Sequence, residues 1–439
     1  MKKTALVISF IFLLFTTEFA QTKDFVSISL KEAVSKGLEN NFGIRISAKD
    51  LTVAKNNDSW GKAGLYPNVS VGANQINRYD NSPSKLTDGR DDSYMNSLTP
   101  YLNVRMNLFN GFSVKITKEN LDKLKSLSEG NLRLTLENTV ADIINAYNSV
   151  LLGDEKLKVT EDLMKLSKDR YTYMLMKKDL GLSVTYQVLQ EKNSFLTDSS
   201  NYLLQLMNKE NAVRELSKVL GDTQIFDYEL TDSLKVIDTD FNLADLETQM
   251  YRNNASLNIQ ETNNQIIENN IKTAKSSLYP SLSLNIGTEQ TNSLLNYNSQ
   301  SSHSYSYDAY ANLALSYSVF NGNNRKRAIA NAKIDAEKSQ LKIDELKMIL
   351  RNNLYNLYEM YNIRKQMLNV ARENFKAASL NLEISKEKFQ SGIINSFNYR
   401  DIQIVYMNAA FALSQSKYYL NLRYNDLLKI TGNILEDYQ

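Results

Sequence analysis

The sequence predicts a mixed α/β protein made of two tandem repeats, each with two β-strands and long α-helices. Three observations support this prediction: motifs recur at a nearly constant offset, four segments alternate with period two, and long stretches lack helix breakers. The 439 residues include only 15 Gly and 4 Pro, although 42% of them are hydrophobic. Such a composition excludes a disordered chain and favours long, uninterrupted helices.

The first twenty residues have the layout of a signal peptide. Lys2 and Lys3 precede an apolar segment at 5–15, and Ala20 is a small residue before a plausible cleavage point. The apolar segment is shorter than the roughly 18 residues that a membrane span needs, so an N-terminal anchor is the less favoured alternative. Residues 1–20 are therefore predicted to direct export. The mature chain is then periplasmic or secreted, or it enters a membrane as β-strands.

An internal duplication is visible in short motifs that recur in the same order. Leu-Tyr-Pro at 65–67 returns at 278–280, an offset of 213 (280 − 67). Phe-Asn-Gly at 109–111 returns at 320–322, an offset of 211 (322 − 111), and Gly181 returns as Gly392 at the same offset. A series at nearly constant offset indicates duplication of one structural unit. We place the first repeat at 21–243 and the second at 244–439.

Alternating patterns predict strands at 65–76, 98–109, 279–289 and 307–320. In the second of these, for example, Leu102, Val104 and Met106 alternate with Asn103 and Arg105. This period fits a membrane wall with lipid on one side and water on the other, although a half-buried soluble sheet shows the same alternation. Aromatic residues near the strand ends favour the membrane, where they form girdles. The polar segments 78–97 and 290–306 are predicted to be loops.

The remaining sequence is predicted to be helical. The stretch 114–178 contains no Pro, and its apolar residues at 136, 140, 143, 147 and 150 follow the spacing of a coiled-coil seam. A helix of about 65 residues is about 100 Å long, too long for a globular domain. The stretches 30–62 and 185–220 are about half as long. Gly181 and Gly392 are expected at tight turns of helical hairpins, because glycine accepts positive φ.

Four membrane strands cannot close a barrel alone. Known single-chain barrels begin at eight strands, and open strand edges in lipid leave backbone groups without hydrogen bonds. The chain is therefore expected to oligomerise. Two copies would supply eight strands around a filled interior, and three would supply twelve around a pore.

The duplicated units, the Leu-Tyr-Pro strand openings, the Phe-Asn-Gly motifs and the hairpin glycines together resemble the TolC-like outer-membrane efflux family (outer membrane factors). The resemblance covers essentially the whole mature chain. It implies a homotrimer with a twelve-stranded β-barrel in the lipid of the cell outer membrane and an α-helical coiled-coil tunnel in the periplasm. Such a protein is the passive exit duct of a tripartite efflux or type I secretion system. Its expected partners are a periplasmic membrane-fusion adaptor and an inner-membrane pump.

The resemblance also implies candidate sites at the ends of the helical hairpins. Apolar residues beside a turn glycine would meet the adaptor, at Leu180, Gly181, Leu182, Ser183, Ser391, Gly392, Ile393 and Ile394. The family's periplasmic gate has acidic residues six and nine positions after the second hairpin glycine, where this chain has Asn398 and Asp401. Asn398 departs from that pattern, so only Asp401 is expected to form a ring of carboxylates in an oligomer. Arg400 is expected to pair with a carboxylate in a closed state. The alternative for all three gate candidates is a solvated helix face.

Other function classes fit the sequence less well. The chain has no Cys, and its one His, His303, lies in a polar segment, so neither a His-based triad nor a Cys/His metal site is expected. We expect no enzyme and no cofactor. The net charge of +2 favours no nucleic-acid partner. The competing hypothesis is a periplasmic coiled-coil adaptor or tether without a pore. Drug, metal ion and polypeptide cargoes are equally compatible with the sequence.

Overall fold

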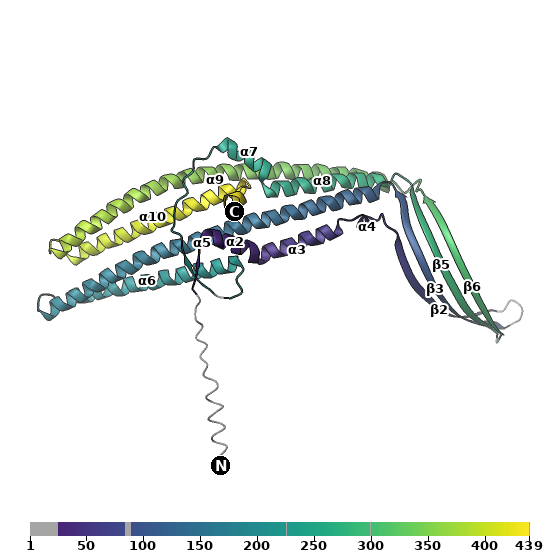
Figure 1. Ribbon diagram of the computed structural model, residues 1–439, viewed down its shortest axis with the longest axis horizontal. Helices are drawn as coiled ribbons and strands as arrows, with labels where there is room; N and C mark the ends of the chain where they lie inside the picture. Colours follow the sequence, from purple (N-terminus) through teal and green to yellow (C-terminus); the bar gives the residue numbers. More distant parts are fainter. Residues whose placement is uncertain (1–24, 84–88, 225, 299, 439) are drawn as a thin grey trace, which may run out of the picture. The chain divides into compact units, whose positions relative to one another are not determined.

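The computed structural model describes residues 25–83, 89–224, 226–298 and 300–438 (Figure 1). The predicted signal peptide at 1–20 lies outside these residues. The described chain forms two compact units, of which unit 1 comprises 25–45, 135–253 and 351–438, and unit 2 comprises 46–134 and 254–350. Each unit therefore takes segments from both predicted repeats.

Two long helices and two half-length helices dominate the chain. Helices α5 (Ser113–Asp179) and α9 (Asn324–Gln390) have 67 residues each. Helices α6 (Thr185–Leu220) and α10 (Ser396–Ile430) follow them with 36 and 35 residues. Their lengths match those expected from the scarcity of helix breakers. No described helix is both long enough and apolar enough to cross a lipid bilayer.

Shorter elements complete the helical part. Unit 1 contains α2 (Leu30–Asn40), α7 (Leu243–Asn253), α11 (Ile434–Tyr438) and the parallel strands β1 (Phe25–Ile28) and β4 (Asp227–Leu230). The stretch expected as one helix at 30–62 is instead divided into α2, α3 (Phe42–Asn57) and α4 (Trp60–Ala63). Helix α2 begins at a capping box, in which Ser29 and Glu32 each bind the other's backbone N–H. Helix α8 (Ala255–Ser276) precedes the second pair of long strands.

The core of unit 1 lies along the predicted coiled-coil seam. Val140, Ile143 and Tyr147 on α5 are buried, as is Tyr361 on α9. The Tyr147 hydroxyl donates a hydrogen bond of 2.7 Å to the Asp232 carboxylate. The Tyr361 hydroxyl donates one of 2.9 Å to a backbone carbonyl in the same connecting segment, that of residue 239. Two buried tyrosines, one on each of the 67-residue helices, therefore hold the segment that joins the repeats.

Unit 2 contains a four-stranded antiparallel sheet in the order β2-β3-β5-β6 (Figure 1). Its strands are β2 (Asn68–Pro83), β3 (Arg90–Asn110), β5 (Ser281–Tyr297) and β6 (Gln300–Ser316). The loop predictions were wrong for most of 78–97 and 290–306, which are strand wherever the structure describes them except at residue 89 and at the turn residue 298. Polar side chains in these segments form hydrogen bonds between neighbouring strands. For example, Gln75 donates a hydrogen bond of 2.9 Å to Asn96. Residues 317–320, predicted as strand, lie beyond the end of β6.

The sheet has one apolar and one polar face over its half nearest the helices. Cross-strand partners such as Val71 with Leu102 and Leu284 with Leu313 share the apolar face, because partners in a ladder point the same way. On the opposite face, Asn103 donates a hydrogen bond of 2.8 Å to Asn285. Val71 is 81% exposed and Leu313 67% exposed, so the described chain does not cover this apolar face at those positions.

Candidate functional site

The ends of the two helical hairpins have the same backbone geometry. The turn between α5 and α6 and the turn between α9 and α10 contain Gly181 at φ +74° and Gly392 at φ +73°. A β-carbon at either glycine would have no neighbour within 4 Å, so the positive φ alone requires glycine. The N–H groups of Leu182 and Ile393 each bond back to a helix carbonyl, at 2.8 and 2.9 Å. Both helices therefore end in tight, satisfied turns.

Large apolar side chains project from these turns. Leu180 is 74% exposed, and Leu182 and Ile393 are each 71% exposed. The two serines are tied locally: the Ser183 hydroxyl donates 2.8 Å to Gln187, and the Ser391 hydroxyl donates 2.8 Å to a backbone carbonyl of α9. Ile394 is half-buried. Three further exposed apolar side chains lie at these ends and were not predicted from the sequence; they belong to Val184, Tyr186 and Phe397.

Among the gate candidates, Arg400 is engaged in an ion pair across the hairpins. Its Nη1 and Nη2 donate hydrogen bonds of 2.6 Å each to the two carboxylate oxygens of Asp198 on α6. The Asp198 side chain is only 3% exposed and that of Arg400 18%. Asn398 and Asp401 are exposed on α10, and the Asn398 N–H is capped by the Asn395 side chain. The geometry therefore separates Arg400 from the other two candidates.

A second buried polar group lies in the same region and was not predicted. Arg170 of α5 is 4% exposed, and its Nε lies 3.1 Å from the carboxylate of Glu191 on α6. Its Nη1 donates to Gln403 of α10, and its guanidinium lies 5.8 Å from the centre of the Tyr399 ring. Burial lowers the pKa of Arg170, and the Glu191 carboxylate opposes that shift. The sequence signal that could have revealed this group is the presence of charged residues, Arg170 and Glu191, at helix positions that would otherwise be apolar.

These two groups connect the first hairpin to the second. Arg170, Glu191 and Asp198 belong to α5 and α6, whereas Arg400 and Gln403 belong to α10. The buried Arg170 and the half-buried Arg400 face two buried carboxylates, so the cluster is close to neutral. A buried charge that loses its partner is costly, whereas an intact pair contributes little net stability. The cluster therefore penalises separation of the hairpins more than it stabilises the fold.

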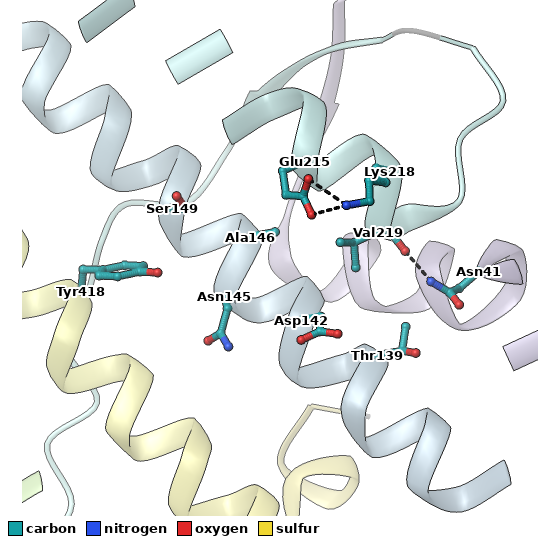
Figure 2. A pocket seen from close by; sticks show the side chains of 10 residues that line it. All are labelled: Asn41, Thr139, Asp142, Asn145, Ala146, Ser149, Glu215, Lys218, Val219 and Tyr418. Atoms are coloured by element: carbon teal, nitrogen blue, oxygen red, sulfur yellow. Dashed lines mark hydrogen bonds and ion pairs between the residues drawn. The ribbon is translucent and has the colours of Figure 1, made fainter. Parts of the chain in front are cut away.

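A polar groove of about 550 Å³ lies elsewhere in unit 1 (Figure 2). Lys218 donates a hydrogen bond of 2.8 Å to Glu215, and Asn41 donates one of 2.8 Å to the Val219 carbonyl; dashed lines in Figure 2 mark both. None of its ten lining residues is His or Cys. Over the residues that the structure describes, no cluster of His, Asp and Glu could hold a metal ion.

Comparisons with known proteins agree with this picture. The model of the family described as outer membrane efflux protein matches residues 33–222 and 248–433. The fold also matches that of CusC, whose structures concern transmembrane channel formation, with a TM-score of 0.73, 15% identity and 95% of each chain covered. The Campylobacter jejuni outer membrane channel CmeC matches with a TM-score of 0.72 and 16% identity, covering 92% of this chain and 85% of CmeC. The Neisseria gonorrhoeae outer membrane channel MtrE matches with a TM-score of 0.69 and 14% identity, covering 92% of this chain and 89% of MtrE.

The helical hairpins and the two-faced sheet together define a channel-forming protein. No curated protein sequence gives a significant match to the chain. The family model nevertheless covers most of the chain in two segments, one in each predicted repeat. The chain belongs to the outer membrane efflux protein family. The protein is accordingly an exit duct of the outer membrane with its helical part in the periplasm.

Proposed function

We propose that three identical copies of this chain form a passive duct, which receives cargo from an inner-membrane pump through a periplasmic adaptor. The observation that carries this proposal is the four-stranded sheet with one apolar and one polar face. Among the described strands, β2 and β6 pair on one side only, so both edges of the sheet are free. In lipid such edges need partners, and further copies of the chain supply them.

The surface of unit 1 supports assembly of several copies. Leu189, Leu196 and Leu203 on α6 follow one another at intervals of seven residues and are 53%, 53% and 61% exposed. A heptad stripe of exposed leucine is typical of a helix that packs against another helix. A soluble tether would leave this stripe and the apolar face of the sheet in water. The stripe therefore favours the oligomeric duct over the tether.

The hairpin ends are the surface that we assign to the adaptor. Exposed apolar side chains beside a rigid turn form a compact patch, and such patches mark protein interaction sites. Leu180, Leu182 and Ile393 supply three of these exposed side chains. Because the turns are fixed by backbone hydrogen bonds, the patch is presented without an ordering cost.

We assign the gate to the buried ion pair between Arg400 and Asp198. The pair joins α6 to α10, so any movement of one hairpin away from the other must separate these charges. Asp401 is exposed and contributes a carboxylate to the rim of the passage in the assembled duct. Asn398 contributes no charge there, so the acidic ring is single.

Conductance of the purified mature protein in planar lipid bilayers tests the duct. We expect discrete current steps, with the Asp198→Asn variant open for a larger fraction of the time. Native mass spectrometry of the detergent-solubilised protein supplies the copy number, for which we expect three. A protein that gives no steps and stays monomeric in detergent would overturn the duct and favour the tether.

A further inference from the structure

We infer that β6 of one copy pairs with β2 of the next in a single register, in which Ala314 lies opposite Asn74 of the next copy. This inference deepens the proposed function, because it rests on the chain being a subunit of an oligomer. It follows from the contacts between the first repeat and the second, which are made within the chain. Because the repeats are equivalent, the second repeat is expected to make the same contacts with the first repeat of another copy. All residues of the inferred contact belong to unit 2, which is one compact unit.

The two repeats reproduce each other's internal pairing. In the first repeat, Val71 of β2 lies opposite Leu102 of β3. In the second, Leu284 of β5 lies opposite Leu313 of β6. The offset of 213 carries Val71 onto Leu284, and the offset of 211 carries Leu102 onto Leu313. The offsets read from short sequence motifs therefore hold for the sheet residue by residue.

The junction from the first repeat to the second is made inside the chain. Strand β3 pairs with β5, where Asn103 lies opposite Gly287. A β-carbon added at Gly111 would collide with the Ser276 backbone, and one at Gly130 would lie 2.9 Å from Ile259. The opposite junction, from the end of the second repeat to the start of the first, is not made by the described residues. Strand β6 pairs only with β5, and β2 only with β3.

The difference in length between β3 and β6 is the first sign of the missing junction. Strand β3 has 21 residues and β6 has 17. Residues 106–110 of β3 lie beyond the pairing with β2 and are held by β5 alone. Their equivalents in the second repeat, 317–321, have no such strand beside them and are not strand. Val319 is 87% exposed and Phe320 77% exposed, as expected for a strand end that awaits a partner.

The helices show a second sign. The close approach of the Ile259 side chain to Gly130 corresponds, by the same offsets, to Ile46 of the next copy facing Leu341, where the larger leucine requires a wider spacing of the helices. Within one chain Leu341 is 67% exposed and Ile46 is 62% exposed. One heptad away on each of these helices, Ile334 is 52% exposed and Val53 is 57% exposed. Four large apolar side chains are thus left in water on the two helix segments that the duplication brings together.

The glycines of the strand-to-helix turns give a third sign. Gly111 and Gly322 have φ of +65° and +64°. Gly111 packs against backbone, whereas a β-carbon at Gly322 would meet nothing within 4 Å. By the offsets, the backbone at Ala63 of the next copy fills the space beside Gly322. The two glycines then have the same environment.

The register follows from these equivalences. Applying 211 to Asn103 and −213 to Gly287 gives Ala314 opposite Asn74, two residues on the polar face. The neighbouring pair, Leu313 opposite Gln75, lies on the other face, so the alternation of β6 and β2 is kept. Because different edges meet, the contact is head-to-tail and must close into a ring.

Double-cysteine crosslinking tests the register, and the chain contains no cysteine of its own. We compare Asn74→Cys with Ala314→Cys against Ile76→Cys with Ala314→Cys, which is two residues out of register on the same face. Ser283→Cys with Ala314→Cys is the positive control, because these residues are cross-strand partners within one chain. We expect about tenfold more covalently linked copies from the first variant than from the second, since disulfides require Cα atoms within about 6.8 Å.

The outcomes separate the register from the duct itself. Native mass spectrometry that finds trimers, together with equal crosslinking of both variants or preference for Ile76, would overturn the register and leave the duct intact. Monomers would overturn both. As an independent readout, Gly322→Ala should lower the trimer fraction more than Gly181→Ala, because both strain a positive φ and only Gly322 faces the next copy. Equal effects of the two substitutions would contradict the helix-side contact.

Discussion

Arg400 of the second hairpin donates one hydrogen bond of 2.6 Å to each carboxylate oxygen of Asp198 in the first hairpin. The two residues are 202 positions apart in the chain. The forked geometry needs a guanidinium, because a lysine ammonium cannot donate two parallel bonds. The guanidinium of Arg400 therefore makes this bidentate interaction only when the two hairpins lie side by side.

Removal of Arg400 should be more damaging than neutralisation of Asp198. Arg400→Ala leaves a buried carboxylate without a cation, which costs about 3–5 kcal/mol of unfolding free energy for a fully buried pair. Asp198→Asn keeps the shape and removes the charge, so its loss should be smaller. Denaturant unfolding measures both. Lys218→Ala is the control, because its pair with Glu215 is exposed and is worth at most about 1 kcal/mol. A loss for Arg400→Ala no larger than that of the control would contradict the buried pair.

Charged residues at the hairpin ends should abolish export without preventing assembly. Leu182→Glu and Ile393→Glu each place a carboxylate in the apolar patch, and its burial against an adaptor would be costly. Export by cells, copy number and adaptor pull-down are the measurements. Ile237→Glu, at an exposed loop position, is the matched control and should export normally. Normal export by both tip variants would remove the docking assignment.

Two glycines with similar φ should differ in their tolerance of alanine. Gly181 and Gly221 have φ of +74° and +80°. A β-carbon at Gly181 meets nothing, whereas one at Gly221 lies 2.6 Å from the Asn40 carbonyl oxygen. Gly181→Ala should cost about 1–2 kcal/mol for the left-handed backbone alone. Gly221→Ala should cost more, because the Asn40 backbone must also move. Thermal unfolding compares them, and equal melting temperatures would contradict the close approach.

Acid should weaken the attachment of Asp58 to α5. Lys118 and Lys125 lie 2.6 and 2.7 Å from its carboxylate and hold the pKa of Asp58 at about 2, below its ordinary 3.8. A depressed folded-state pKa contributes stability that is complete above pH 3.8 and is lost as the pH falls towards 2. The melting temperature of the wild type should therefore drop more across this interval than that of Asp58→Asn. Parallel curves for the two proteins would contradict the pairing.

The sequence alone predicted the features that are local. The hairpin turns at Gly181 and Gly392, a helix of about 65 residues at 114–178 and the buried seam through Ile143 and Tyr147 were all predicted. Each depends on periodicity or on one residue's backbone freedom, both of which are written in neighbouring residues. The internal duplication was visible for the same reason, since it is a pattern of identities at a fixed offset.

The strand segments 90–97 and 290–297 were predicted to be loops because their local composition is typical of loops. Residues 90–97 and 290–297 are rich in Asn, Ser and Asp, which disfavour strands in isolation. In the sheet their side chains find partners on neighbouring strands: Tyr297, for example, donates 2.6 Å to Asp91. Conversely, 317–320 has the right alternation and no strand, because a strand also needs a neighbour to bond.

The amino-acid sequence by itself determined the repeat, the helix lengths, the turn glycines and the alternation of the strands that begin the sheet. Only the tertiary structure decided that Arg400 meets Asp198, that Arg170 is buried beside Glu191, and that β3 adjoins β5. The physical reason is that periodicity fixes which face of an element is apolar, whereas pairing depends on which distant segment the fold brings opposite it.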